Sequence, residues 1–433
     1  MSHKTTMGVK VARCAAVLAL VLSGCVEPKP LPACERLDPG LDWYGANRNQ
    51  IDAMMETYGK CTGSYSTEKK PLAAFDWDNT VVKNDAGDAT FFYMLAHDEI
   101  LQPPGKNWRM TSPFLSEAAV LALDAACGAL AEPGSALPTS SNASCAKELL
   151  SIYSNGVTAS GQTAWATWNY RRMEPAYAWV AQLLAGHTRA EVQSFVEAAM
   201  AENLSNPIDT QQSIAGTSVT HWVRVYDQMK DLIGRLQANG FDVWIISASP
   251  QLVVEPWAKT VGIEADHVIG IRTLEVAGKL DYNLQGCGDV PDGANDGQGR
   301  VTGNSMITYI DGKRCWINKV VFGDTTAGAL DSDHDLKRHP VFAAGDSDTD
   351  ITFMQDSGGL KLAINRNKKE LMCNAYANAN EGWIINPMFI QPRAQQTSPY
   401  PCSTTACKAA DGTPGPCKDL DGFILRDQAD TVF

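Results

Sequence analysis

Residues 71–85 read PLAAFDWDNTVVKND and contain the stretch that decides the fold. The apolar run 72–75 is typical of a short strand buried on both faces, the kind found in parallel sheets. Two acids, Asp76 and Asp78, follow it directly. Carboxylates gathered at the edge of a sheet cost free energy unless a cation or a reaction compensates for them. The stretch therefore predicts a site that uses these charges.

The same pattern of strand, polar turn and helix returns later in the chain. Residues 241–250, FDVWIISASP, predict an apolar strand and a turn that caps a helix at Ser249. Residues 339–354, HPVFAAGDSDTDITFM, predict a strand, an acidic turn and a helix, and residues 361–365, KLAIN, predict a further strand. Strands that alternate with helices indicate an α/β fold with a doubly wound parallel sheet.

The chain divides by composition into five parts. Residues 86–220 are rich in Ala, Leu, Met, Glu and Gln without strand rhythm, which predicts a helical cap domain inserted into the sheet domain. The sheet domain then comprises residues 66–85 and 221–392. Residues 25–65 are predicted to form a tether and a helical extension, and residues 393–433 a tail that contains Cys and Pro.

The first 24 residues predict a lipoprotein signal peptide. A basic start precedes a short apolar run at 15–22, and the tetrapeptide LSGC at 22–25 resembles the bacterial lipobox, whose Cys carries the lipid. The alternative is a plain signal peptide that happens to hold a Cys. We therefore expect a protein of the bacterial cell envelope, lipid-anchored through Cys25, on the periplasmic or the cell-surface face.

Charge and cysteine content narrow the class further. The net charge of −13 and the lack of a basic stripe argue against a nucleic-acid partner. Ten cysteines remain after Cys14 and Cys25, and an even number in an exported chain predicts disulfides; a zinc site is the alternative, but no CxxC pair occurs. Clustering along the chain predicts the pairs Cys34–Cys61, Cys127–Cys145 and Cys287–Cys315, with Cys373, Cys402, Cys407 and Cys417 pairing among themselves.

In doubly wound sheets the functional crevice lies at the carboxyl ends of the strands. Four groups of side chains fall near those ends, in chain order: Asp76 with Asp78, Ser247, Lys319, and Asp346 with Asp350. This order resembles the haloacid dehalogenase superfamily of phosphatases, with its DxDxT, Ser/Thr, Lys and GDxxxD motifs. The resemblance covers residues 72–85 and 225–365, and it implies a Rossmann-like core with an inserted cap.

The resemblance implies a magnesium-dependent phosphomonoester hydrolase that acts on a small phosphorylated metabolite. Asp76 would be the nucleophile that forms an aspartyl-phosphate, and Asp78 the general acid and base. Ser247 would bind a phosphoryl oxygen and Lys319 would neutralise charge. The Mg²⁺ site would comprise Asp76, Asp346 and the backbone carbonyl of Asp78, with Asp350 holding the shell around them. We also expect Thr80, Ala248 and Trp77 to lie next to the substrate.

Two assignments have alternatives within the sequence. Lys313 competes with Lys319 as the motif lysine, because the spacing before the last motif varies in the superfamily; we prefer Lys319. Asp331, Asp333 and Asp335 predict a solvated acidic turn, with a calcium site as the alternative.

The position of the cap resembles the class that includes phosphoserine phosphatases. Residues 245–263, IISASPQLVVEPWAKTVGI, and 382–389, GWIINPMF, resemble secreted bacterial phosphorylcholine phosphatases, which implies a choline-like headgroup. A quaternary ammonium group needs an aromatic cage. Packing in the core is the alternative for each of the aromatic candidates: Trp43, Tyr44, Trp77, Trp165 and Trp168.

Two other functions stay open. The superfamily's dehalogenases lack an acid at the position of Asp78, so this residue favours a phosphatase or a phosphotransferase. A non-catalytic lipoprotein that uses the fold for binding is the third reading, and intact motifs disfavour it. The sequence does not predict the oligomeric state.

Overall fold

The computed structural model describes residues 31–287, 306–324 and 338–433. The predicted signal peptide 1–24, the predicted lipid site Cys25 and the acidic segment 331–335 lie outside the described residues. The lipid anchor, the envelope location and the calcium alternative therefore stay predictions. Within the described ranges, no helix has the length and apolar character needed to cross a bilayer.

A six-stranded parallel sheet forms the core, with the strand order β12-β11-β10-β1-β6-β7. This confirms the predicted α/β fold with a doubly wound parallel sheet. β1 lies inside the sheet, and all four of its residues are buried, as the apolar run predicted. The strands are β1 (Leu72–Phe75), β6 (Asp242–Pro250), β7 (Val268–Ile271), β10 (Phe342–Gly345), β11 (Leu360–Asn365) and β12 (Trp383–Pro387).

Helices flank this sheet and cover its edge at β12. Helix α1 (Asn47–Tyr58) lies beside β12, where the Asn47 side chain donates a hydrogen bond of 2.7 Å to the carbonyl oxygen of Ile385. Covering an edge strand removes a surface on which another chain could pair. The other helices of the sheet domain are α7 (Asp227–Ala238), α8 (Gln251–Ala258), α9 (Asp311–Trp316) with a π-helical turn (Ile317–Val321), α10 (Ile351–Gln355) and α11 (Lys369–Ala377).

The register of β1 fixes which residues share the carboxyl edge. Phe75 is level with Ala344 on β10 and with Ile245 on β6. The ladder extends one residue further, because the backbone N–H of Asp76 donates to the carbonyl oxygen of Ala344 at 2.9 Å. The residues that follow each of these positions therefore meet at one edge of the sheet.

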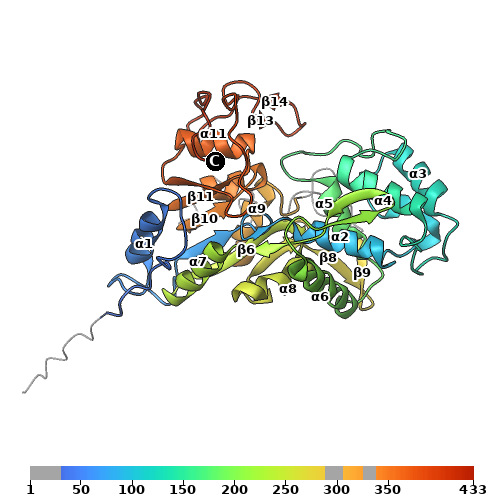
Figure 1. Ribbon diagram of the computed structural model, residues 1–433, viewed down its shortest axis with the longest axis horizontal. Helices are drawn as coiled ribbons and strands as arrows, with labels where there is room; N and C mark the ends of the chain where they lie inside the picture. The colour runs from blue at the N-terminus through green and yellow to red at the C-terminus, as the bar shows by residue number, and fades with distance from the viewer. Residues whose placement is uncertain (1–30, 288–305, 325–337) are drawn as a thin grey trace, which may run out of the picture.

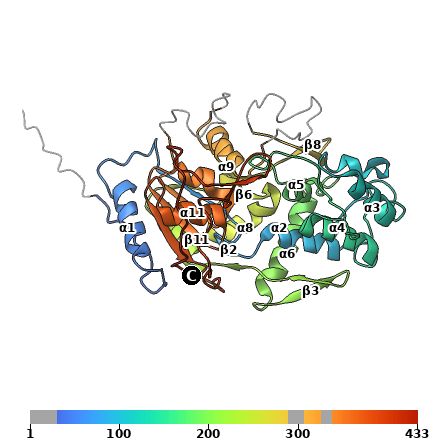
Figure 2. The same ribbon diagram turned by 90° about the horizontal axis from the view of Figure 1, so that it is seen from above.

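The cap forms a second lobe beside the sheet, on the side away from α1 (Figure 1 and Figure 2). Its two connections to the sheet domain pair as a short antiparallel ribbon, β2 (Val82–Lys83) with β5 (Arg224–Val225). The helices of the cap are α2 (Ala86–Ala96), α3 (Glu117–Cys127), α4 (Ala143–Asn155), α5 (Pro175–Gln182) and α6 (Arg189–Ser205).

The cap also contains a β-hairpin, which the prediction of a mostly helical segment missed. Strands β3 (Gln211–Ile214) and β4 (Thr217–Thr220) are joined by Ala215 and Gly216, both with positive φ, at 48° and 83°. Two positive φ angles suit a tight hairpin turn. The sequence gives no Asn-Gly or Asp-Gly signal there, because Ala occupies the first turn position.

Further contacts join the cap to the sheet domain and to the tail. The hairpin β8 (Thr273–Val276) and β9 (Lys279–Leu284) reaches α5, and the backbone of Leu280 exchanges hydrogen bonds of 2.8 Å with Gly186 and His187. Arg171 of the cap pairs with Asp311 of α9 at 3.2 Å and with Glu370 of α11 at 2.7 Å. The tail reaches the cap at Tyr170, whose ring lies 4.6 Å from the ammonium of Lys408.

The tail after residue 392 is held by disulfides and contains the short strands β13 (Cys407–Lys408) and β14 (Pro414–Gly415). Cys373 of α11 pairs with Cys402, and Cys407 pairs with Cys417. The three pairs predicted from local clustering are also present, at Cys34–Cys61, Cys127–Cys145 and Cys287–Cys315. All the predicted disulfide pairs are therefore confirmed.

Two adjacent glycines before β11 give a matched test of the packing. A Cβ at Gly359 would lie 2.1 Å from the carbonyl oxygen of Val341, whereas a Cβ at Gly358 meets nothing within 4 Å. We expect Gly359→Ala to lower the free energy of unfolding by about 2–3 kcal/mol, because the backbone must shift. Gly358→Ala should change it by less than about 1 kcal/mol. Urea unfolding of both variants checks this; equal loss would contradict the packing argument.

Candidate active site

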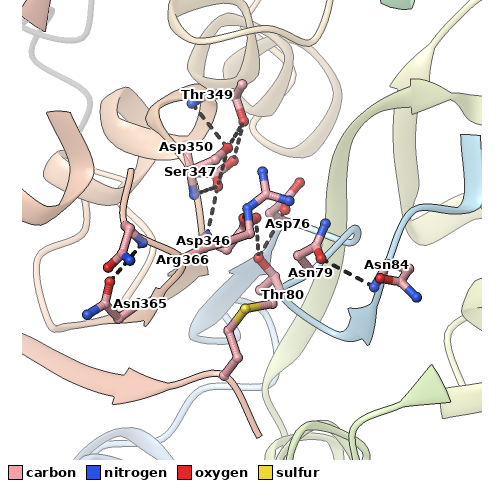
Figure 3. Close-up of polar contacts among 12 residues, drawn as sticks. Asp76, Asn79, Thr80, Asn84, Asp346, Ser347, Thr349, Asp350, Asn365 and Arg366 are labelled. Carbon is pink, nitrogen blue, oxygen red and sulfur yellow. Dashed lines mark hydrogen bonds and ion pairs between the residues drawn. The ribbon is translucent and has the colours of Figure 1, made fainter. Parts of the chain in front are cut away.

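Three buried carboxylates meet at the carboxyl edge of the sheet (Figure 3). Asp76 follows β1, Asp346 follows β10, and Asp350 ends the short helical turn behind it. One oxygen of each acid lies within 4.8 Å of an oxygen of the others. The Asp350 carboxylate accepts the backbone N–H groups of Asp346 and Ser347 at 3.0 and 3.1 Å. Gly345 permits this turn, because a Cβ there would lie 2.5 Å from the Cβ of Asp350.

Lys313 provides the buried cation of this cluster. Its Nζ lies 2.6 Å from Oδ1 of Asp76 and 2.6 Å from Oδ1 of Asp350, and its side chain is fully buried. Burial lowers the pKa of Lys313, but the charges of Asp350 and Asp76 outweigh burial and raise it overall. The ammonium therefore remains charged and orients both carboxylates.

The preference for Lys319 over Lys313 is wrong. Lys319 lies on the π-helical turn after α9, where its Nζ is 3.3 Å from the carbonyl oxygen of Gly286 and 5.0 Å from the centre of the Trp316 ring. Lys313 lies in α9 itself, which packs against the turn that holds Asp350. Spacing along the chain could not separate the two lysines, because the orientation of α9 decides which one enters the cluster.

Thr80 links two of the acids. Its hydroxyl lies 3.0 Å from Oδ2 of Asp76 and 3.2 Å from Oδ1 of Asp346, and the residue is fully buried. We predicted Thr80 to lie next to the substrate. The structure places it behind the carboxylates, where it fixes the orientation of Asp76.

Asp78 is held by a hydrogen-bond set that the sequence revealed only in part. It accepts the hydroxyl of Ser249 at 2.7 Å, the hydroxyl of Ser247 at 3.4 Å and the backbone N–H of Ala86 at 2.7 Å. Ser249 does not cap the next helix, because β6 continues to Pro250 and α8 begins at Gln251. The alternation of a continuous strand places Ser247 and Ser249 on the same face, and this signal could have identified Ser249.

Arg366 is the second cation of the site, and the sequence analysis missed it. It follows β11 directly, and its Nε lies 2.7 Å from Oδ2 of Asp346 (Figure 3). Burial lowers the pKa of Arg366, but the charge of Asp346 raises it overall. The available signal was position: a charged residue at the carboxyl end of a predicted strand in a doubly wound sheet.

Acids outnumber cations in this part of the molecule. Burial, opposed by Lys313, raises the pKa of Asp76 to about 6. Burial and the charge of Asp85 raise the pKa of Asp78 well above its ordinary value. Burial raises the pKa of Asp85 to about 7 and that of Asp88 to about 6, and the latter accepts the Tyr153 hydroxyl at 2.5 Å. Such a surplus of buried negative charge favours the binding of a further cation.

The carboxylates open into a cavity between the sheet and the cap. Ala248, Ser249 and Arg366 line it from the sheet domain, and Tyr153, Tyr177 and Val180 line it from the cap. Ala248 was predicted to lie next to the substrate, and its place in the cavity lining agrees with that prediction. The cavity therefore combines acids, one arginine and two phenol rings.

The prediction that Trp77 contacts the substrate is wrong. Asp76 and Asp78 face the site, so the residue between them points the other way, and Trp77 is fully buried in the core. Trp165 packs against Trp179, and Trp43 packs against Phe389. Among the described residues, the cavity lining includes none of the five predicted cage aromatics.

The donors around Asp76 fit a magnesium ion. Mg²⁺ prefers carboxylate and carbonyl oxygens, and Asp76, Asp346 and Asp350 offer three carboxylates within 4.8 Å. Burial is the main cause that raises the pKa of each of these carboxylates, and a bound cation would favour their charged forms. Asp76, Asp346 and Asp350 are therefore the residues that would hold the ion.

A protein-family model described as haloacid dehalogenase-like hydrolase matches residues 157–355. The chain carries a haloacid dehalogenase-like hydrolase domain. The matched range includes Ser247, Lys313 and Asp346, and the fold brings Asp76 and Asp78 to them from outside it. The predicted superfamily and the prediction of a hydrolase of this type are confirmed.

Solved structures resemble the hydrolase at low sequence identity. A conserved protein of unknown function from Anaerococcus prevotii DSM 20548 has a TM-score of 0.58 and 21% identity, over 81% of this chain and 94% of that chain. A protein of unknown function from Bordetella pertussis Tohama I has a TM-score of 0.43 and 17% identity, over 74% of this chain and 100% of that chain. A phosphoserine phosphatase, solved as a phospho-aspartyl intermediate analogue, has a TM-score of 0.31 and 14% identity, over 68% of this chain and 87% of that chain. No curated protein matches the sequence.

Magnesium should stabilise the hydrolase through the carboxylate cluster. At about one hundred times Kd, binding to the folded state alone raises the free energy of unfolding by about 2.7 kcal/mol. We expect this gain in the wild type and its loss in Asp346→Asn. Asp348→Asn is the matched control, because Asp348 accepts the backbone N–H of Leu371 and lies outside the cluster. Melting temperatures with Mg²⁺ and with chelator measure the effect; an unchanged magnesium shift in Asp346→Asn would contradict it.

Proposed function

We propose that this hydrolase is a magnesium-dependent phosphomonoesterase with Asp76 as its nucleophile. The observation that carries the proposal is the position of Asp76 at the carboxyl end of β1, 2.6 Å from the buried ammonium of Lys313 and open to the cavity. A carboxylate held in this way is oriented for attack on phosphorus.

The two steps use Asp76 and Asp78 in turn. A carboxylate oxygen of Asp76 attacks phosphorus, and the ester oxygen leaves with a proton from Asp78, which gives an aspartyl-phosphate and an alcohol. In the second step a water molecule gives its proton back to Asp78 and attacks the phosphoryl group. The products are inorganic phosphate and free Asp76. Contacts from Ser249 and Ala86 hold the Asp78 carboxyl in place for both transfers.

The remaining cations offset the charge of the phosphoryl group. Lys313 and Arg366 supply two fixed positive charges. The Ser247 hydroxyl, predicted to bind a phosphoryl oxygen, donates to Asp78 at 3.4 Å, and Ser249 lines the cavity instead of it. Bound Mg²⁺ would reduce the repulsion between the attacking carboxylate and the dianionic phosphate.

We propose phosphocholine as the first substrate to test. The cap side of the cavity offers the rings of Tyr153 and Tyr177, and Asp85 adds an acid to the lining. Aromatic faces and carboxylates suit a cationic headgroup. The sequence resemblance to secreted phosphorylcholine phosphatases supports the same choice, and it agrees with the proposed location in the cell envelope.

Phosphate release from p-nitrophenyl phosphate, phosphocholine, phosphoethanolamine and phosphoserine tests the function. We expect magnesium-dependent turnover that falls by at least about 10³-fold in Asp76→Asn, because the nucleophile is lost. Transfer of phosphate to added choline or glycerol would identify a phosphotransferase instead. If folded protein releases no phosphate from any of these esters, the proposal of a phosphomonoesterase is wrong, and a binding function replaces it.

The two lysines provide a matched test of the site. Lys313→Met should lower kcat by about 10²–10³-fold, because the charge next to Asp76 is lost. Lys319→Met should leave kcat within about threefold of the wild type. Steady-state kinetics on the best ester compares them; the reverse order of effects would restore Lys319 as the motif lysine.

A further inference from the structure

The tail surrounds the strand end that carries Arg366. This strand end is the segment Asn365–Asn367, at and just after the end of β11. Asn367 has a positive φ of 61°, and its side chain accepts the Tyr400 hydroxyl at 3.0 Å and donates to the carbonyl oxygen of Ala394 at 3.1 Å. Both of these partners belong to the tail, so tail residues fix one side of the turn that follows Arg366.

Asn365 connects the strand end to residues near position 430. Its side-chain amide donates to Oδ1 of Asp430 at 3.0 Å and also to the carbonyl oxygen of Val432. Its side-chain oxygen accepts the backbone N–H of Asn367 at 2.9 Å, which closes a turn around Arg366. Asn365 and Arg366 point to opposite sides of the strand end (Figure 3), so the tail contacts one and the cavity the other.

Asp430 is a buried acid that the catalytic steps do not use. It is 3% exposed, and its Oδ1 also accepts the Tyr376 hydroxyl at 2.6 Å. Its Oδ2 accepts the backbone N–H of Gln396 at 2.8 Å. Asp430 thus collects donors from β11, from α11 and from the tail, and its removal would take one acceptor from each of these three donors.

We propose that Arg366 contacts the phosphoryl group and that Asp430 is a positioning residue, which acts on Arg366 through Asn365. Arg366 lies between the Asp346 carboxylate, 2.7 Å from its Nε, and the cavity that it lines. A guanidinium binds phosphate through a planar fork of N–H donors, so its affinity for phosphate depends on its orientation. The proposal rests on the proposed function for the ester substrate, but phosphate binding can be measured without turnover.

A double-mutant cycle separates positioning from a general structural role. The variants are Asp430→Ala, Arg366→Ala and the pair together, each measured for kcat, KM and the Kd of inorganic phosphate by titration calorimetry with Mg²⁺. We expect Asp430→Ala to weaken phosphate binding and to raise KM by about tenfold when Arg366 is present. In the Arg366→Ala background the same change should have less than about a twofold effect.

Two further variants complete the test: one is a control, and the other is a milder change at the same acid. Asp427 is also in the tail, and its side chain accepts the backbone N–H of Ser403, which belongs to the tail itself, so Asp427→Ala should bind phosphate as the wild type does. Tyr376→Phe removes one hydroxyl from Asp430 and should weaken phosphate binding by about threefold, with the same dependence on Arg366. If Asp430→Ala does not fold, Tyr376→Phe takes its place in the cycle.

The outcomes are distinct. A loss of phosphate affinity that disappears without Arg366 supports the proposal, even if no ester is turned over and the proposed function fails. An equal loss in both backgrounds shows that Asp430 only stabilises the fold, and it overturns the proposal. Unchanged phosphate binding in folded Asp430→Ala, or in Arg366→Ala, overturns it as well.

Discussion

The contact on which the site depends is that of the Lys313 ammonium with Asp76 and Asp350. A buried ion pair adds little stability compared with apolar packing, but breaking it leaves an uncompensated buried charge. The sheet can therefore bring Asp76 and Asp350 together only while α9 inserts Lys313 between them. Burial is the main cause that raises the pKa values of Asp76 and Asp350, and neighbouring acids add to it; this concentration of buried carboxylates favours a further positive charge.

The sequence was sufficient where a residue's position follows from strand periodicity. The apolar run of β1 and the acids after β1 and β10 predicted the sheet and placed Asp76 and Asp346 at one edge, because parallel strands end together. The same reasoning failed for Lys313, since α9 is a short helix whose orientation depends on tertiary packing. It failed for Trp77, where the resemblance to phosphorylcholine phosphatases implied an aromatic cage but alternation along the chain turns the indole into the core.

The cap and the tail show a different limit of sequence reasoning. Local clustering of cysteines predicted the disulfides correctly, because each pair closes a short loop. Arg171 is separated from its partner Glu370 by 199 residues, and Asn365 from Asp430 by 65. No local pattern encodes such contacts, so the residues that hold the cap and Arg366 in place could be found only in the folded structure.

The Cys373–Cys402 disulfide has a consequence for the tail contacts. Cys373 lies three residues before Tyr376, and Cys402 lies two residues after Tyr400, and the rings of these tyrosines lie 5.9 Å apart. The bond therefore raises the effective concentration of one tyrosine at the other, since a short covalent tether replaces a long search by the chain. Hydrogen bonds that would be weak and transient between free segments become a persistent part of the folded state beside Arg366.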